Sequence, residues 1–185
     1  MPKLDQLLVS IEQAESSGHA KQNWKPTQVG EINIHIKADG QWFHEGRPFK
    51  RLALVKLFAS VLRREGNAHF LVTPGEKLAI QVDDAPFVAT TVELLNNKDH
   101  QALTFTTTLG DSIIADKQHP IRVETDPVTG LPRPYIHFRN GLEAIISRSA
   151  FFDLANTAKA VERNGDTHLI VHSMGAEFSL GICDE

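Results

Sequence analysis

Two stretches half a chain apart repeat one another in this 185-residue sequence. HFLVTPGEKLAI at residues 69–80 is followed by the similar HLIVHSMGAEFSL at residues 168–180. The match extends upstream without a gap, where Arg64, Gly66, His69 and Val72 match Arg163, Gly165, His168 and Val171. A one-residue insertion then aligns Gly75 with Gly175. Such repeats are typical of chains built from similar units. The pattern predicts helix, glycine stop, strand, turn and strand in each copy, although general helix-to-hairpin preferences would produce the same order.

The first residues predict a short amphipathic helix. Leu4, Leu7, Leu8 and Ile11 follow helical spacing within residues 3–15, which places their apolar side chains on one face. Such a face either docks a partner or packs on the rest of the chain. We favour the second alternative, because it is the ordinary use of an apolar stripe.

Strand and helix signals follow in the first half of the chain. Alternation of apolar and polar residues over 30–37 precedes Asp39-Gly40 and the run QWFHE. This predicts a β-hairpin, because Asp-Gly suits a tight two-residue turn. A helix is expected over residues 48–65, since its proline suits a first helical turn and Gly66 follows its end.

The remaining chain is rich in short strands. Turn signals such as NNKD, LGD and DPVTGLP separate apolar or alternating runs: HFLVT, KLAIQV, FVATTVELL, LTFTTT, SIIA, IRVE and PYIHFR. A second helix is expected over residues 149–165, and a final hairpin, HLIVH and EFSLG, closes the chain. The pattern predicts an α+β fold.

Composition excludes several classes of function. The formal net charge is -4 and the isoelectric point is about 6.1, whereas nucleic-acid and polybasic membrane-surface binding need a marked excess of Lys and Arg. Cys183 is the only cysteine, so no internal disulfide or thiolate zinc site can form within one chain. No signal peptide or run of about 20 apolar residues is present. We therefore expect a cytoplasmic protein with protein, peptide or small-molecule partners, without nucleic acid and without membrane insertion.

Several linked phrases carry a resemblance to a known family. In order from about residue 30 to residue 181, they are DGQWFHEGRPFKR, LFASVLRREG, HFLVTPGEKLAIQVDDAPF, HPIRV, PYIHFRNGLEAIISR and GAEFSLG. The chain resembles the bacterial proteins catalogued as domain of unknown function twelve eighty-five. The resemblance implies two consecutive pleckstrin-homology-like units, each a bent antiparallel β-sheet with a packing helix, after the N-terminal helix. One departure is Gly75, where the resemblance implies a larger residue before the Glu-Lys pair.

The expected division is an N-terminal helix and connector over residues 1–28, a first unit over residues 29–96 and a second unit over residues 97–185. The two units are not simple copies, because about two strands precede the helix of the first and about five precede that of the second. The family has no established activity, so a signalling or binding role follows from the fold alone, which is weak support for function.

The segment WFHEGRPFKR at residues 42–51 is the strongest candidate for a binding site. It brings an aromatic ring, a histidine, an acid and three basic groups to a strand-to-helix junction. Its arginines suit bidentate binding of phosphate or carboxylate. Alternatively, Arg51 forms an internal ion pair with Glu76 or another carboxylate, which we favour. The candidate ligand-binding residues in this half of the chain are Trp42, His44, Arg47, Arg51 and Glu76.

Arg148 lies at the corresponding place before the second helix and completes the set of candidates. We expect Glu143 to be its structural partner. Arginines at matching places therefore indicate a shared scaffold as readily as twin ligand sites.

No pattern indicates a cofactor, a metal ion or a catalytic nucleophile. His168 and His172 fall on a predicted strand, roughly 13 Å apart at about 3.3 Å per residue, which is too far to share one ion. TPGEK at residues 73–77 lacks the glycine spacing and the Ser/Thr after Lys of a phosphate loop, so we expect a turn. The first hairpin, HIKADGQW, has one Lys, which leaves phosphoinositide recognition unsupported.

We therefore expect a non-enzymatic binding or signalling adaptor for a peptide or small anionic ligand. One alternative is an enzyme with a non-local active site for a small anionic substrate, its residues drawn from Arg47, Arg51, Glu76, His119 and Tyr135. Another is a subunit of a larger assembly, which an apolar patch above a few hundred Å² would indicate. A pocket holding several of the five residues favours the enzyme, and a shallow surface groove favours the binding module.

Overall fold

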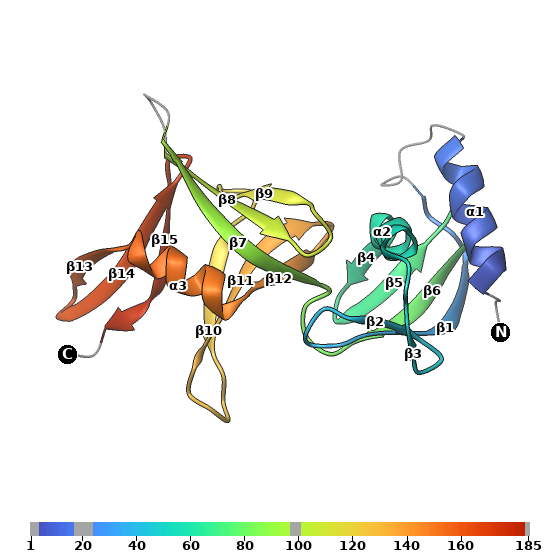
Figure 1. Cartoon of the computed structure of the whole chain (residues 1–185), viewed down its shortest axis with the longest axis horizontal. Helices are drawn as coiled ribbons and strands as arrows, with labels where there is room; N and C mark the ends of the chain where they lie inside the picture. Colours follow the sequence, from blue (N-terminus) through green and yellow to red (C-terminus); the bar gives the residue numbers. More distant parts are fainter. Residues whose placement is uncertain (1–3, 17–23, 97–100, 184–185) are drawn as a thin grey trace. The chain divides into compact units, whose positions relative to one another are not determined.

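The computed structural model describes residues 4–16, 24–96 and 101–183 (Figure 1). Two compact units make up the chain, Met1–Pro86 and Phe87–Glu185. The turn signal NNKD predicts a division near residue 96. Strand β7 (Phe87–Asn96) instead belongs to the second unit and pairs with the next strand of the chain.

The first unit contains a six-stranded sheet and two helices. Its described elements in chain order are α1 (Leu4–Ser16), β1 (Gln28–Ile36), β2 (Trp42–His44), β3 (Arg47–Pro48), α2 (Leu52–Ser60), β4 (Leu62–Glu65), β5 (Ala68–Val72) and β6 (Glu76–Val82). The strand order is β3-β2-β1-β6-β5-β4. Neighbouring strands are antiparallel except β1 and β6, which are parallel, so this sheet is mixed where the resemblance implied an antiparallel one.

The β1–β2 hairpin confirms the prediction made from Asp39-Gly40. Ile36 faces Trp42 across the pair, and Gly40 has a φ of 81°, which a glycine adopts without the strain of a side chain. The isoleucines of β1 are buried, as the alternation predicts. The hairpin thereby presents one apolar face to the core of the unit.

Helix α1 packs its apolar face against the protein. Leu7 and Ile11 are fully buried, whereas Val9, on another face of the helix, is 51% exposed. The contacts of α1 group it with the first unit. Burial of each large aliphatic side chain contributes about 1.5–3 kcal/mol, so self-packing is the better account of this stripe than docking of a partner.

Both helices predicted next to a glycine stop end earlier than the sequence indicates. Helix α2 ends at Ser60, and residues 62–65 form β4, in which Leu62 faces Leu71 of β5. Both leucines are at most 1% exposed. Burial across a strand pair therefore overrides the helical preference of the sequence LRRE. Gly66 is the first residue of a hairpin turn, with a φ of 61°, and is not a helix stop.

The second unit contains one helix and two sheets. Its described elements after β7 are β8 (Gln101–Thr107), β9 (Ser112–Ile114), β10 (Ile121–Thr125), β11 (Pro132–Arg139), β12 (Leu142–Ile146), α3 (Arg148–Asn156), β13 (Lys159–Arg163), β14 (Asp166–Ser173) and β15 (Ala176–Cys183). The first sheet has the order β10-β11-β12-β7-β8-β9, with β12 and β7 parallel, and the second has the order β13-β14-β15. Here too the predicted helix is shorter, because residues 159–163 form β13.

The repeat in the sequence corresponds to a repeat in the structure. A helix and three antiparallel strands follow one another in each unit, as α2-β4-β5-β6 and as α3-β13-β14-β15. Thr73 and Ser173 occupy the same place before the last turn, and both are 1% exposed. The expected α+β architecture of an N-terminal helix and two units is confirmed. Each unit has a six-stranded sheet and a helix, and the second unit adds a three-stranded sheet.

Candidate functional site

An open groove lies in the first unit where β1 and β6 separate. Glu31 faces Ala79 and His35 faces Gln81, so β1 advances four residues while β6 advances two. The extra residues of β1 form a β-bulge, a feature that often redirects side chains beside binding sites. The groove has a volume of about 560 Å³, within the range of small-ligand sites.

The groove is lined by apolar and polar residues. Ile32 and Ile34 are buried, and Ala79 and Ile80 are half-buried. The polar lining side chains are Glu31, Asn33, His44, Glu45 and Gln81. Because Ile32 and Ile34 face the core, a ligand in the groove would chiefly meet the half-buried and exposed residues of this lining.

Two carboxylates line the groove, and no Lys or Arg does. Glu31 and Glu45 are exposed, and neither forms an ion pair within the part of the chain that the structure describes. Glu45 has a φ of 49° in the tight turn between β2 and β3, and its N–H donates to the Asn33 carbonyl at 3.1 Å. The β2–β3 turn is thereby fixed against β1 at the groove, which carries net negative charge.

The strand-to-helix junction separates the predicted aromatic and basic candidates. Trp42 is 4% exposed and lies in the core rather than on the surface, whereas His44 lines the groove. Arg47 is exposed and faces His44 across the β2–β3 pair. Because facing residues of an antiparallel pair point to the same side of the sheet, Arg47 projects on the side of His44.

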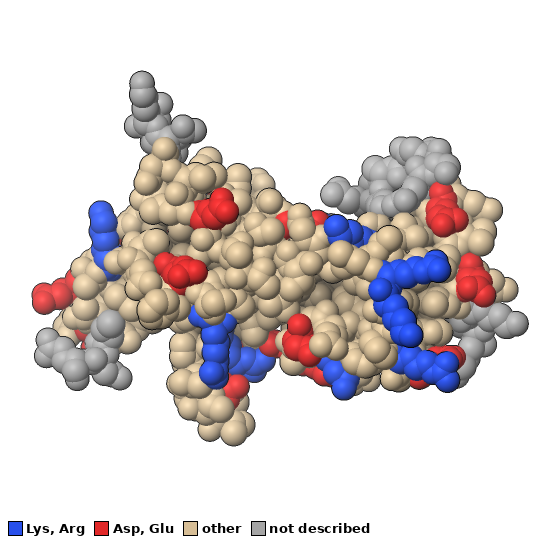
Figure 2. Space-filling model, viewed as in Figure 1, with Lys and Arg blue, Asp and Glu red and all other residues tan. Residues whose placement is uncertain are grey.

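Four exposed basic side chains lie between the start of β3 and the middle of α2, and together we call them the cationic surface: Arg47, Lys50, Arg51 and Lys56. No Asp or Glu occurs in residues 46–64. Figure 2 shows Lys and Arg side chains gathered on the first unit, over the region where Figure 1 places β3 and α2. The local charge is therefore opposite in sign to that of the groove.

Arg51 does not form the internal ion pair that the sequence analysis favoured. Within the described ranges neither Arg47 nor Arg51 has a carboxylate partner. Glu76 is half-buried at the start of β6, where its carbonyl accepts the Thr73 N–H at 2.9 Å and closes the turn predicted for TPGEK. The Arg47 and Arg51 side chains are instead exposed to solvent.

Arg51 also occupies the N-cap of α2. Its side chain makes no capping hydrogen bond, and the first turn of α2 has no acidic residue. The first N–H groups of a helix carry partial positive charge. The start of α2 therefore adds to the positive potential of the cationic surface.

Arg148 and Glu143, expected to pair, do not do so. Arg148 is the exposed first residue of α3. Glu143 of β12 instead accepts hydrogen bonds from Arg122 of β10, at 2.6 Å from Nε and 2.7 Å from Nη2. No local signal in the sequence predicts this pair, because β10 and β12 lie on either side of β11 only in the folded sheet.

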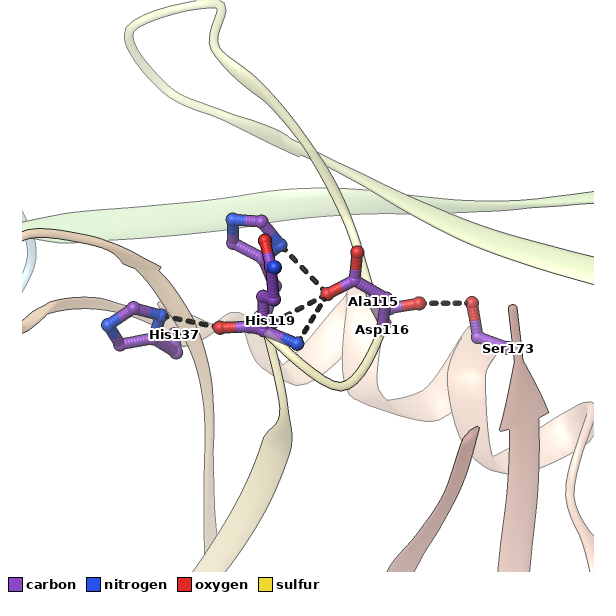
Figure 3. A network of polar contacts seen from close by, with 6 residues as sticks. Ala115, Asp116, His119, His137 and Ser173 are labelled. Carbon is purple, nitrogen blue, oxygen red and sulfur yellow. Dashed lines mark hydrogen bonds and ion pairs between the residues drawn. The ribbon is translucent and has the colours of Figure 1, made fainter. Parts of the chain in front are cut away.

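His119, from the enzyme alternative, belongs to a turn in the second unit (Figure 3). Asp116 accepts hydrogen bonds from the backbone N–H groups of Gln118 and His119 and from the His119 ring at 2.9 Å. Burial alone would raise the pKa of Asp116, but these hydrogen bonds lower it below its usual value. His137 donates to the Gln118 carbonyl at 3.0 Å. The imidazoles thus hold a turn together.

Tyr135, also from the enzyme alternative, is 3% exposed and serves as a stacking surface. The Arg122 guanidinium lies 4.2 Å from the centre of its ring. The groove holds none of the five residues of the enzyme alternative, which are divided between the two units. The structure therefore does not bring those residues together in a described cavity.

Within the described residues, no group of three or more His, Cys, Asp or Glu side chains is placed to hold a metal ion. None of the described helices combines the length and the apolar character needed to cross a membrane.

Sequence reasoning missed most of the groove. Alternation along β1 places Glu31 and Asn33 on its polar face, which is a usable signal for exposure. The bulge gave no signal, because it depends on the register of β1 against Gln81 and its neighbours on a strand some distance along the chain.

Comparison with known proteins identifies the family. The model of the N-terminal domain of DUF1285, a domain of unknown function, matches residues 21–85, and the model of the C-terminal domain of DUF1285 matches residues 86–180. The chain belongs to the DUF1285 family. The resemblance stated from the sequence is thereby confirmed.

Two solved structures of DUF1285 family proteins are similar to this chain. The protein from Silicibacter pomeroyi DSS-3 is 44% identical in sequence to this chain, and its crystal structure matches with a TM-score of 0.83. The match covers 95% of this chain and 94% of that chain. The protein from Shewanella baltica OS155 is 25% identical in sequence, and its crystal structure matches with a TM-score of 0.52. This match covers 66% of this chain and 90% of that chain. None of the curated proteins compared with this DUF1285 chain matches it.

Proposed function

We propose that this DUF1285 protein is a non-enzymatic binding module that takes an anionic peptide or small anionic ligand on its cationic surface. The observation that carries the proposal is the exposure of Arg47, Lys50, Arg51 and Lys56 from one segment that contains no Asp or Glu. The signalling role and the cytoplasmic location expected from the sequence belong to this proposal and stay predictions.

The charge distribution supports an anionic partner. The whole chain has a net charge of -4, so an anion is repelled on average and attracted to the local excess of Lys and Arg. Arg47 and Arg51 supply planar forks that bind carboxylate or phosphate bidentately. Because no described carboxylate pairs with either guanidinium, binding breaks no internal ion pair.

The geometry supports binding more than catalysis. A catalytic site gathers acid, base and substrate-orienting groups within one concave region. The cationic surface instead presents flexible basic side chains of one kind, and the groove beside it holds His44 but neither arginine. Such a surface recognises charge and provides no general acid–base pair.

The test is the affinity of the full chain for a fluorescein-labelled hexaglutamate peptide, measured by anisotropy at low salt, with pyrophosphate as the small competing anion. We expect saturable binding that weakens as salt rises, because exposed charges are screened beyond about 10 Å at 0.1 M ionic strength. The double variant Arg47→Glu/Arg51→Glu should lose at least about tenfold in affinity, equivalent to about 1.4 kcal/mol.

The matched control is Arg148→Glu/Lys159→Glu, which reverses two exposed basic residues of the second unit. The proposal requires this variant to retain the affinity of the unmodified protein within about twofold. Equal losses in both double variants would mean that only net charge matters. Absence of binding to both anions at low salt would reject the proposal.

A further inference from the structure

We propose that the partner bound by the cationic surface is an acidic segment of a protein whose carboxylates flank an aliphatic side chain. The inference rests on the proposed function and names the class of its partner. The observation that carries it is an exposed apolar face of α2, centred on Leu52, next to the basic side chains of that surface. A single phosphate or a small dicarboxylate would leave this face uncovered.

Helix α2 is apolar on both of its sides. Its inner side consists of buried residues: Val55, Phe58 and Ala59. On the outer side Leu52 is 53% exposed, and Ala53 is exposed as well. Surface helices normally carry polar residues on the face turned away from the core, but Lys56 is the only charged residue of α2. The outer face therefore lacks the polar character that contact with water alone would favour.

Basic side chains lie beside this apolar face. Arg51 directly precedes Leu52, and Lys56 follows one turn further along the helix, at the i+4 position whose side chain neighbours that of Leu52. Both basic residues are exposed. Their methylene groups extend the apolar surface while their charged ends stay in water. The combination is complementary to a row of carboxylates that also carries an aliphatic side chain.

The basic groups are spread along the surface rather than gathered at one point. Arg47 belongs to β3, whereas Arg51 and Lys56 are separated by about 7.5 Å along the axis of α2, at 1.5 Å per residue. One phosphate or carboxylate group cannot contact all of them at once. Several carboxylates in a row can, and each exposed pair adds a modest amount to the affinity. The spacing therefore favours a segment of polypeptide over a compact anion.

An anionic membrane is less suited to this surface. Helices that bind membrane surfaces present a broad apolar face with large side chains, whereas the large apolar side chains of α2 other than Leu52 are buried or half-buried. The net charge of -4 also opposes approach to anionic lipids. The proposed partner is therefore a protein segment, and the membrane is the competing outcome of the test.

The test is the affinity of the full chain for two fluorescein-labelled octapeptides, measured by anisotropy at low salt. Each peptide has six glutamates, with two leucines at the centre of one and two serines at the centre of the other. The leucine peptide should bind at least about fivefold more tightly, because its aliphatic side chains cover Leu52. Leu52→Gln should abolish this preference and leave the affinity for the serine peptide unchanged, since glutamine and leucine have similar helix propensities.

The matched control is Leu95→Gln, at a leucine of β7 with the same exposed fraction of 53%, which should retain the preference. Equal affinities of the two peptides, or a preference that survives Leu52→Gln, would overturn the inference and leave the proposed function standing. Absence of binding to both peptides would reject the proposed function as well. Displacement of the leucine peptide by vesicles of equal parts phosphatidylcholine and phosphatidylserine, but not by phosphatidylcholine alone, would assign the surface to a membrane and overturn the inference.

Discussion

Arg122 and Glu143 form a bidentate ion pair that spans β11, with Nε and Nη2 of the arginine 2.6 Å and 2.7 Å from the two carboxylate oxygens. The same guanidinium stacks on Tyr135 of the intervening strand. The pairing raises the pKa of Arg122 above its usual value, chiefly through the hydrogen bonds to Glu143. Three strands of the first sheet in the second unit are thereby tied together on one face.

Replacing Glu143 by Gln should destabilise the protein by about 1–2 kcal/mol, because charge-assisted hydrogen bonds are lost while the partly exposed arginine regains some water. Urea unfolding measures the change. The control is Glu124→Gln, which removes the other carboxylate near Arg122. The side chain of Glu124 is 59% exposed. This control should cost no more than about 0.5 kcal/mol. Equal losses in the two variants would contradict the account of the bidentate pair.

Ser173 connects the two sheets of the second unit. Its Oγ, in a residue that is 1% exposed, accepts the Leu103 N–H at 2.9 Å. The same hydroxyl donates to the Ala115 carbonyl at 2.6 Å (Figure 3). Ser173→Ala should therefore cost about 1–3 kcal/mol, because two buried backbone groups lose their partner. Ser112→Ala, at an exposed position of β9, is the control and should be nearly neutral in thermal unfolding. A neutral Ser173→Ala would show that these groups find other partners.

Gly66 and Gly75 should respond in opposite ways to alanine. Gly66 has a φ of 61°, in which an added side chain is strained, whereas Gly75 has no positive φ and a Cβ there would meet no atom within 4 Å. Gly66→Ala should cost about 1 kcal/mol, and Gly75→Ala should be neutral or slightly stabilising. Chemical denaturation measures both changes. If the helix expected over residues 48–65 extended through Gly66, Gly66→Ala would instead be stabilising.

His35 lowers the pKa of Asp83, first through a hydrogen bond of 2.6 Å and then through its charge, with smaller contributions from Gln81 and Lys37. A carboxyl group whose pKa is lowered on folding stabilises the folded state at pH values above its usual pKa of about 3.9. That stabilisation is lost as the pH falls through the folded-state pKa. In His35→Ala, the pKa of Asp83 should rise toward its usual value when the carboxyl is titrated by NMR.

The internal control for this titration is Asp126. Hydrogen bonds from the backbone N–H groups of Thr129 and Val128 lower its pKa, so it should keep its low value in His35→Ala. An unchanged pKa of Asp83 in the variant would show that the imidazole is not the cause of the shift.

The sequence predicted those elements whose signals are local. Asp39-Gly40 has the conformational preference of the turn that it makes, and the apolar stripe around Leu7 has the spacing of the helix that it forms. The ends of α2 and α3 were wrong, because residues 62–65 and 159–163 suit a helix and become strands only by pairing with β5 and β14. Non-local pairing competes with local preference, and local signals contain no information about it.

The same distinction applies to the candidate sites. The exposure of Arg47 and Arg51 follows from their charge and their place at a junction, which the sequence displays. The burial of Trp42 and the partner of Glu143 depend on neighbours contributed by distant segments. The groove was missed for the same reason, since a strand register cannot be read from either strand alone.

The most direct test of the central claim, that the cationic surface binds an anionic partner, is an NMR map of the full chain during titration with hexaglutamate peptide. The account predicts that backbone amide shifts concentrate in residues 46–57, around β3 and the start of α2, and that they vanish in Arg47→Glu/Arg51→Glu. Shifts centred on the second unit around Arg148, or no shifts at concentrations where the peptide binds, would contradict it.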